Sequence, residues 1–166
     1  MTKYLPTLLV AAVVCLNPRA AAPQAGPPHT GKAAVLATGE HSTGVKVELL
    51  AVTRDSPTVV TVRWRYRNES AEPKRLTNQR TGSIDAYRLS LDSYLLDEVK
   101  RVKYPVARDS NREPVASRNG ATNQYIVIAP KSTIDVWAKY VVGDDVSTVT
   151  VAIDGVPPFS GIAITR

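Results

Sequence analysis

A short alternation of apolar and polar residues is the feature that most constrains how this chain can fold. It is clearest between Thr58 and Asn68, where polar residues alternate with Val60, Val62, Trp64 and Tyr66. Successive side chains of a strand point to opposite faces of a sheet, so this period of two predicts a strand with one buried face. No stretch keeps a helical period for longer than a turn. The pattern therefore predicts an all-β protein.

Further short runs of this kind follow one another along the chain. They are Val45 to Ala51, Tyr87 to Leu91, Tyr94 to Asp97, Val102 to Val106, two runs within 126–140, Ser147 to Ile153 and Ile162 to Ile164. Pro, Gly, Asn and Asp residues separate them at spacings of about ten residues. Such a series predicts an antiparallel β-sandwich of about 7 to 9 strands.

Two consecutive hairpins are predicted between residues 94 and 140. The first joins Tyr94–Asp97 to Val102–Val106 through a charged reversal, and the second lies within 126–140. Pro105 has no N–H to donate to a neighbouring strand, so its strand is predicted at a sheet edge. Between the hairpins, Arg108 to Thr122 is predicted to be a long loop.

The N-terminus has the features of an export signal, predicted over residues 1–22. Lys3 precedes an apolar run from Leu8 to Leu16, and small residues follow at Ala20 to Ala22. The run is about half the roughly 20 residues that a membrane-spanning helix needs, so no transmembrane span is expected after cleavage. Residues 23–43 are rich in Pro, Gly and Ala and are predicted to be a flexible linker or an early edge segment, ahead of a β-sandwich domain at 44–166.

Cys15, the only cysteine, raises the alternative of a lipid anchor. A bacterial lipoprotein signal would acylate a cysteine at the end of the apolar run, but Val14 occupies the preceding position, where a small residue is usual. We therefore favour export to the periplasm or the medium over lipidation at Cys15. If Cys15 is removed, the mature chain can form no disulfide, thiol nucleophile or thiolate metal site.

The charge balance is only mildly basic. The full chain carries +6, and removal of Lys3 and Arg19 leaves 19 basic and 15 acidic residues, a net charge of +4. Export argues against nucleic acid as the partner of this charge. An envelope protein or an anionic envelope polymer is the expected partner, although an ordinary soluble surface also explains such a small excess.

Three arginines form the sharpest chemical feature. Arg63, Arg65 and Arg67 alternate with the inward residues of the 58–68 strand, so their guanidinium groups lie about 6.5 to 7 Å apart on the outward face. Such a row could bind carboxylates or phosphates, with Lys74 and Arg75 extending it. The alternative, which we favour, is a solvated face paired with acids on neighbouring strands, which also discourages aggregation.

A polar loop is the second candidate for a contact with a partner, through Arg108, Asp109, Asn111, Arg112 and Glu113. Oxygen donors at every second position resemble a calcium loop. Arg112 and Pro114 stand where a further acid or a glycine would be needed, so a polar turn is favoured over a metal site. Asp144 and Asp145 are likewise predicted to lie in a turn.

No catalytic or cofactor-binding constellation is apparent. The two histidines are His29, in the predicted linker, and His41, at the predicted domain edge, and no Gly-x-Ser-x-Gly motif or zinc spacing is present. Trp64, Tyr66, Trp137 and Tyr140 could line a groove, but core packing is the simpler explanation. Because strands can bring distant acids together, a carboxylate site remains open.

Four segments resemble a family of bacterial extracytoplasmic domains. They are Tyr94 to Asp97, Lys103 to Ser110, Trp137 to Tyr140, and Val149 to Val151 with Pro157 to Phe159. The resemblance spans about residues 44 to 164. It implies an immunoglobulin-like sandwich, of a kind found in lipoproteins and ahead of outer-membrane-protein-A-type domains. Because the sequence ends at Arg166, we do not expect the anchoring role of such a peptidoglycan-binding domain to apply to this chain.

These observations predict a non-enzymatic exported protein of the bacterial envelope, an immunoglobulin-like module that binds or scaffolds. A small secreted hydrolase with a carboxylate site is one alternative. The other is a periplasmic enzyme inhibitor that acts through a rigid exposed loop between Arg108 and Asn119.

Overall fold

The computed structural model describes residues 34–77, 85–120 and 125–166. The predicted signal peptide, Cys15, His29 and most of the predicted linker lie outside these residues. Within them the chain is built from antiparallel strands, which confirms the all-β fold class. No described helix is long and apolar enough to cross a bilayer.

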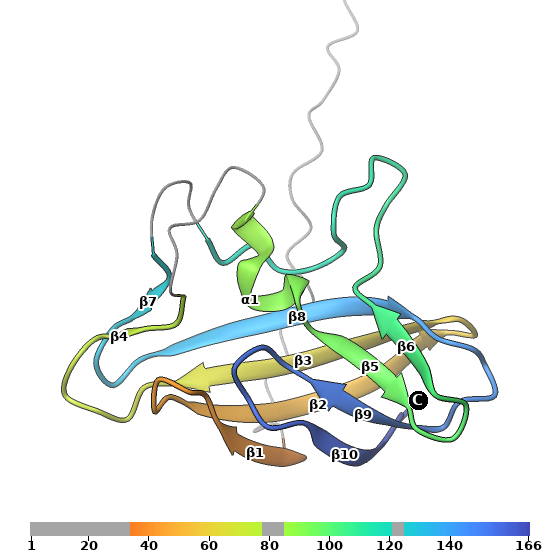
Figure 1. The fold of residues 1–166 in the computed structure, drawn as a ribbon, viewed down its shortest axis with the longest axis horizontal. Coiled ribbons are helices and arrows are strands. Elements are labelled where there is room, and N and C mark those ends of the chain that lie inside the picture. The colour runs from red at the N-terminus through yellow and green to blue at the C-terminus, as the bar shows by residue number, and fades with distance from the viewer. Residues whose placement is uncertain (1–33, 78–84, 121–124) are drawn as a thin grey trace, which may run out of the picture. The chain divides into compact units, whose positions relative to one another are not determined.

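The strands form two four-stranded sheets and one small pair (Figure 1). The first sheet has the order β1 (Ala37–Glu40), β2 (Lys46–Ser56), β3 (Val59–Arg67) and β8 (Thr133–Val141). The second has the order β10 (Phe159–Ala163), β9 (Thr148–Ala152), β5 (Tyr94–Asp97) and β6 (Val102–Pro105). The pair consists of β4 (Lys74–Arg75) and β7 (Val127–Ile128).

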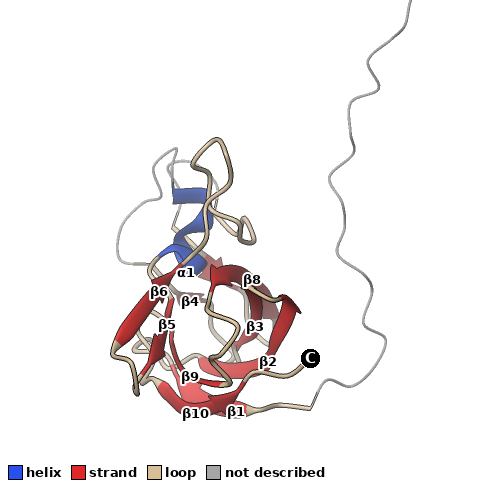
Figure 2. Ribbon diagram, turned by 90° about the vertical axis from the view of Figure 1, so that its right-hand side faces the viewer, coloured by secondary structure: helices blue, strands red, loops and turns tan. Residues whose placement is uncertain are grey.

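The two larger sheets face each other, as the end-on view of Figure 2 shows. Their inward side chains form one core, whose largest fully buried members are Trp64, Tyr66, Tyr140, Leu49 and Leu95. The four apolar residues predicted to face inward from β3 are all buried. The arrangement is sandwich-like, and its assignment to the immunoglobulin type remains a prediction.

Backbone hydrogen bonds also cover the outer edges of β2 and β8. β1 covers the first part of β2, and Thr165 covers the later part by donating to Val52 O and accepting from Arg54 N, at 2.9 and 2.8 Å. On the opposite side, isolated bridges join Val106 to Tyr140 and Ala116 to Ala138. Most of the backbone of the first sheet is therefore paired, which limits edge-to-edge association.

The first predicted hairpin is confirmed and the second is wrong. β5 pairs with β6 across a turn in which Asp97 Oδ1 accepts the N–H groups of Val99 and Lys100, and β6 lies at a sheet edge as Pro105 predicts. β7, by contrast, pairs with β4 rather than with β8. The reason is that β8 already pairs with β3 along one edge and with residues 107 and 115–117 along the other.

The strand predicted from Tyr87 to Leu91 is also wrong. This segment forms a 3-10 turn, η1 (Asp85–Tyr87), and one turn of helix, α1 (Arg88–Leu91). Ser90 Oγ donates to Tyr87 O at 2.9 Å, and Ser93 N donates to Ser90 O at 3.1 Å. Such local serine bonds compete with strand pairing, and a single helical turn still buries Leu89.

Several predicted boundaries move. β2 continues to Ser56, through part of the turn predicted at 54–57, and β10 begins at Phe159 rather than Ile162. Residues 37–40, inside the predicted linker, pair with β2 as the edge strand β1, so the sheet begins before residue 44. The loop predicted from Arg108 is observed as far as Gly120, and its last two residues lie outside the described chain.

Candidate functional site

Two of the three arginines on the outward face of β3 are held by acids. Arg65 donates to Asp135, with Nε to Oδ1 at 2.5 Å and Nη2 to Oδ2 at 2.8 Å, and Arg67 donates to both oxygens of Glu48 at 3.1 Å. The Arg65 hydrogen bond lowers the pKa of Asp135, and the Arg67 hydrogen bond lowers that of Glu48. These pairs match the alternative we favoured for this face.

Arg63 differs from its two neighbours. Its cross-strand partners are Ala51 on β2 and Trp137 on β8, and no described residue accepts a hydrogen bond from its guanidinium. Lys74 and Arg75 do not extend the row, because they form β4 in the separate two-stranded sheet. Of the candidate row of three guanidinium groups, only that of Arg63 has no ion-pair partner among the described residues.

The tip of the predicted contact loop is held by hydrogen bonds to the carboxylate of Asp109. Asp109 Oδ1 accepts from the backbone N–H groups of Asn111 and Glu113, both at 2.9 Å. Asp109 N donates to Glu113 O at 2.9 Å, and Arg108 Nη1 donates to Arg112 O at 2.7 Å. Arg112 takes the left-handed conformation, with φ of 65°. The Asp109 carboxylate thus holds the polar turn together.

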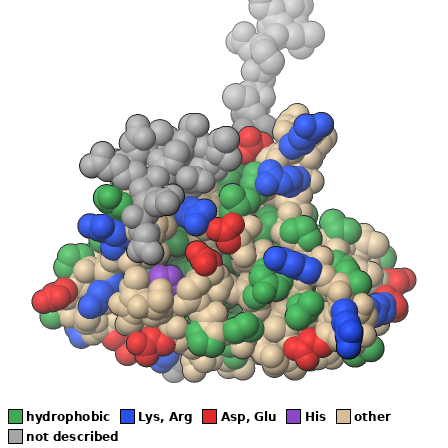
Figure 3. All heavy atoms as spheres, viewed as in Figure 1, with side chains coloured by type: hydrophobic (Ala, Val, Ile, Leu, Met, Phe, Trp, Pro, Cys, Tyr) green, Lys and Arg blue, Asp and Glu red, His purple; other side chains and the backbone are tan. Residues whose placement is uncertain are grey.

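The base of this loop is attached to β8. Ala107 N donates to Lys139 O at 2.7 Å, Lys139 N donates to Val115 O at 2.9 Å, and Ser117 N donates to Trp137 O at 2.9 Å. The loop leaves the sandwich beyond β6 (Figure 1), and basic side chains lie over it in Figure 3. Residues 108–113 are all exposed. The loop is therefore a projecting segment with a braced stem and a hydrogen-bonded tip.

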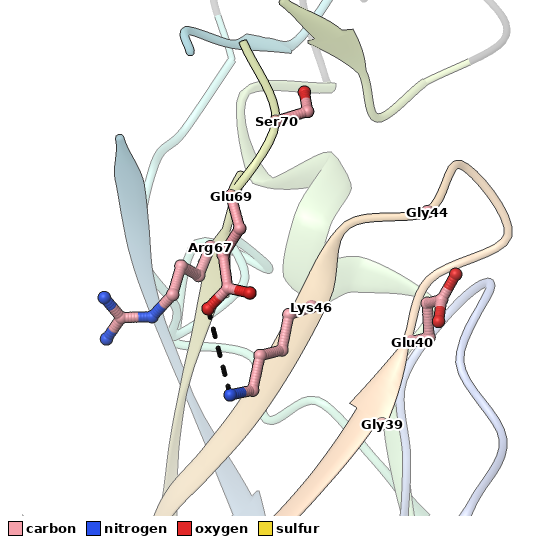
Figure 4. A pocket seen from close by; sticks show the side chains of 7 residues that line it. All are labelled: Gly39, Glu40, Gly44, Lys46, Arg67, Glu69 and Ser70. Carbon is pink, nitrogen blue, oxygen red and sulfur yellow. Dashed lines mark ion pairs between the residues drawn. The ribbon is translucent and has the colours of Figure 1, made fainter. Parts of the chain in front are cut away.

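A pocket of about 240 Å³ opens beside β1, β2 and the end of β3 (Figure 4). It is lined by Gly39, Glu40, Gly44, Lys46, Arg67, Glu69 and Ser70. Lys46 Nζ lies 3.9 Å from Glu69 Oε1, and Lys46 stands between the two glutamates in the view of Figure 4. The sequence does not predict this pocket, because its lining residues come from separate segments that the pairing of β1, β2 and β3 brings together.

His41, which follows β1, is buried. Its Nδ1 lies 2.7 Å from Thr43 Oγ1, and its ring meets Tyr66 edge-on at 5.9 Å between centroids. Burial lowers the pKa of His41, and the charge of Asp154 opposes that shift. Burial raises the pKa of Tyr66 to about 12. Both side chains are therefore neutral at pH 7 and belong to the core.

The remaining polar positions act structurally. Asp145 pairs with Lys100 at the predicted turn. Asn68 is buried, and its Nδ2 donates to Glu72 O at 2.7 Å and to Ala129 O at 3.1 Å. No cluster of three or more His, Cys, Asp or Glu able to hold a metal ion occurs among residues 34–77, 85–120 and 125–166.

Comparisons with protein families, curated proteins and solved structures returned no match for this chain. The resemblance to the extracytoplasmic immunoglobulin-like family thus stays a prediction.

Proposed function

We propose that the chain is an exported, non-enzymatic binding or scaffolding module of the bacterial envelope, with the sandwich as a frame for the loop at 108–119. One observation carries this proposal: the exposed loop is already folded, with Asp109 organising its tip and three backbone bonds tying its base to β8. A loop that is ordered before binding loses less conformational entropy when it meets a partner.

The charges of the tip favour a protein as that partner. Arg108 and Arg112 are balanced by Asp109 and Glu113, all exposed. A uniformly anionic polymer would meet both signs within one turn, whereas a polar protein surface can complement each of them. We therefore place an envelope protein ahead of an anionic polymer.

Replacing Asp109 with Ala tests this proposal. The change removes the acceptor of two backbone N–H groups at the tip and touches no core residue, so partner recovery from envelope extracts should fall several-fold. The free energy of unfolding should stay within about 0.5 kcal/mol, as for other surface changes. Asp144→Ala, in another exposed turn, is the matched control. Equal recovery with Asp109→Ala and native protein would refute the loop's role.

The same loop supports the inhibitor alternative. A braced, projecting segment can enter the cleft of an enzyme, and the two readings differ in what the partner does after binding. If the captured partner is a hydrolase whose turnover falls on titration with the native domain but not with Asp109→Ala, the module is an inhibitor.

The pocket of Figure 4 is the observation that favours a hydrolase, because Glu40 and Glu69 both line it. Glycoside hydrolysis needs two carboxylates with the substrate between them. Here the Lys46 ammonium is ion-paired to Glu69 at the pocket. Cleavage of peptidoglycan fragments by the native protein, lost in Glu40→Gln, would establish this alternative.

A further inference from the structure

Among the described residues, the charged side chains on the outward faces of β2, β3 and β8 all have an ion-pair partner except one. The charges pair as Arg65 with Asp135, Arg67 with Glu48, and Lys139 with Asp55, the last at 2.7 Å. Lys46 lies 3.6 Å from Glu48 and 3.9 Å from Glu69. Arg63 alone among the β3 arginines has no acid within ion-pair distance in the described chain. Arg63 is therefore the one charged side chain on the outward faces of β2, β3 and β8, within the described chain, that lacks an ion-pair partner.

The neighbours of Arg63 are apolar on both sides. The β2 register shifts between Leu49 and Ala51, so Leu50 and Ala51 together oppose Arg63. Trp137 opposes it from β8, and cross-strand partners have Cβ atoms about 4.5 to 5.5 Å apart. Trp137 is partly exposed, in contrast to the fully buried Trp64. In the sheet, Arg63 thus stands between Trp137 on one side and Leu50 and Ala51 on the other.

This setting is suited to a carboxylate. The planar guanidinium offers parallel N–H donors that match the two oxygens of a carboxylate, and partial removal of water strengthens such bonds. The donors of Arg63 are unfilled, because the nearest acids are engaged elsewhere: Asp135 by Arg65, and Asp55 by Thr61 and Lys139. The indole and the aliphatic carbons beside them can bury an apolar side chain of the same ligand.

We propose that Arg63, Trp137 and Leu50 form a docking surface for a polypeptide segment that carries one carboxylate next to apolar side chains. Charge complementarity limits the occupant to a single negative charge, because Arg63 is the one unpaired cation on the outward faces of β2, β3 and β8 within the described chain. Asp135 is diagonal to Arg63 across the β3–β8 ladder and would repel a phosphate dianion or a second acid. Leu50 and Ala51 offer no side-chain hydrogen bonds to sugar hydroxyls, so a peptide is favoured over an acidic polysaccharide.

This surface is distinct from the tip of the loop and does not depend on the proposed function. The two can be separated, because Asp109→Ala alters the loop tip alone and should leave peptide binding at Arg63 unchanged. Loss of one function with retention of the other would identify which proposal has failed.

The test uses acetyl-Leu-Glu-Leu-amide as the probe and acetyl-Leu-Gln-Leu-amide as its neutral match, titrated into the nitrogen-15-labelled protein. The acidic peptide should shift the indole N–H signal of Trp137 and not that of Trp64. The neutral peptide should bind about tenfold more weakly or worse, the usual consequence of losing a hydrogen bond to a charged group. Arg63→Gln should cause a similar loss, and Arg63→Lys an intermediate one.

Arg65→Gln combined with Asp135→Asn is the matched control, since it removes one ion pair on the same face without changing the net charge. It should retain binding of the acidic peptide. The proposal is overturned if folded Arg63→Gln binds the acidic peptide with the same affinity as the native protein, or if millimolar peptide causes no shift at Trp137. Tighter binding of oligogalacturonate than of the acidic peptide would also overturn it, and would assign the surface to an acidic polysaccharide.

Discussion

Gly155 and His41 illustrate how one residue without a side chain allows another to be buried. Gly155 has φ of 70°, and a Cβ placed there would lie 2.5 Å from His41 Nε2. Gly155 O also accepts the N–H of Ser42 at 2.8 Å. The turn before β10 therefore packs directly on the turn between β1 and β2, at a distance that only glycine permits.

Gly155→Ala should destabilise the protein by about 2 to 4 kcal/mol, because it adds left-handed backbone strain to an overpacked contact with His41. Gly161→Ala is the control, since Gly161 has φ of 69° but no atom within 4 Å of an added Cβ. It should cost only about 1 kcal/mol of strain. Urea unfolding measures both, and equal losses would show that contact with His41 contributes nothing.

The arginines of β3 show what residue patterns can and cannot predict. Alternation correctly assigned Arg63, Arg65 and Arg67 to the outward face, because side-chain direction in a strand follows from local geometry. Their separate roles depend on Glu48, Asp135 and Trp137, which come from other strands. Strand register is set by the whole sheet, so the one unpaired arginine could not be recognised from the sequence.

At the scale of elements, α1 occupies the place of a predicted strand and is tied to β8. Ser93 Oγ donates to Ser90 O, which can only accept, so Tyr140 Oη is the donor in its 2.7 Å bond to Ser93 Oγ. Both residues are buried. This pair connects the end of α1 and the start of β5 to the centre of the core.

A double-mutant cycle of Ser93→Ala and Tyr140→Phe measures this connection. Tyr140→Phe should cost about 1 kcal/mol or more, because it leaves a buried hydroxyl acceptor without its donor. The coupling between the two changes should be about 0.5 to 1 kcal/mol. Thermal or urea unfolding of the four proteins gives the value, and strictly additive losses would mean that the hydroxyls do not interact in solution.

Elements joined by short turns were predicted better than those joined at a distance. The β5–β6 hairpin depends on the adjacent turn at Asp97, whose carboxylate caps the reversal. The partner of β7 is β4, more than 50 residues earlier in the chain, and only the competition for the edges of β8 explains that choice. No local pattern in the sequence carries that information.

At the scale of the whole molecule, the buried histidine and the paired acids make stability depend on pH in one direction. The pKa values of His41, Glu48 and Asp135 are all lowered in the folded state, His41 by burial and the two acids by arginine hydrogen bonds. The unfolded chain therefore binds more protons than the folded chain as the pH falls. Through these three groups, stability should therefore increase from acid pH to about pH 7.

The free energy of unfolding should first decrease as the pH falls below about 6.5, where an unfolded histidine becomes protonated, and again below about 4.5, where unfolded carboxylates do. Urea titrations between pH 7.5 and 3.5 test both steps. His41→Gln should remove the first step and keep the second. A native protein with the same pH slope as His41→Gln between pH 7.5 and 5.5 would contradict a buried, neutral His41.

Cross-linking at the loop tip tests directly whether the loop at 108–119 contacts an envelope protein. A photoreactive amino acid replaces Ser110, which is exposed at the tip, or Ser160, which is exposed on β10 as a matched control. Both proteins are irradiated in the native envelope and their adducts are identified by mass spectrometry. If the loop tip binds an envelope protein, position 110 should give one dominant protein adduct that is absent from position 160. The same adducts from both positions, or none from position 110, would contradict such binding.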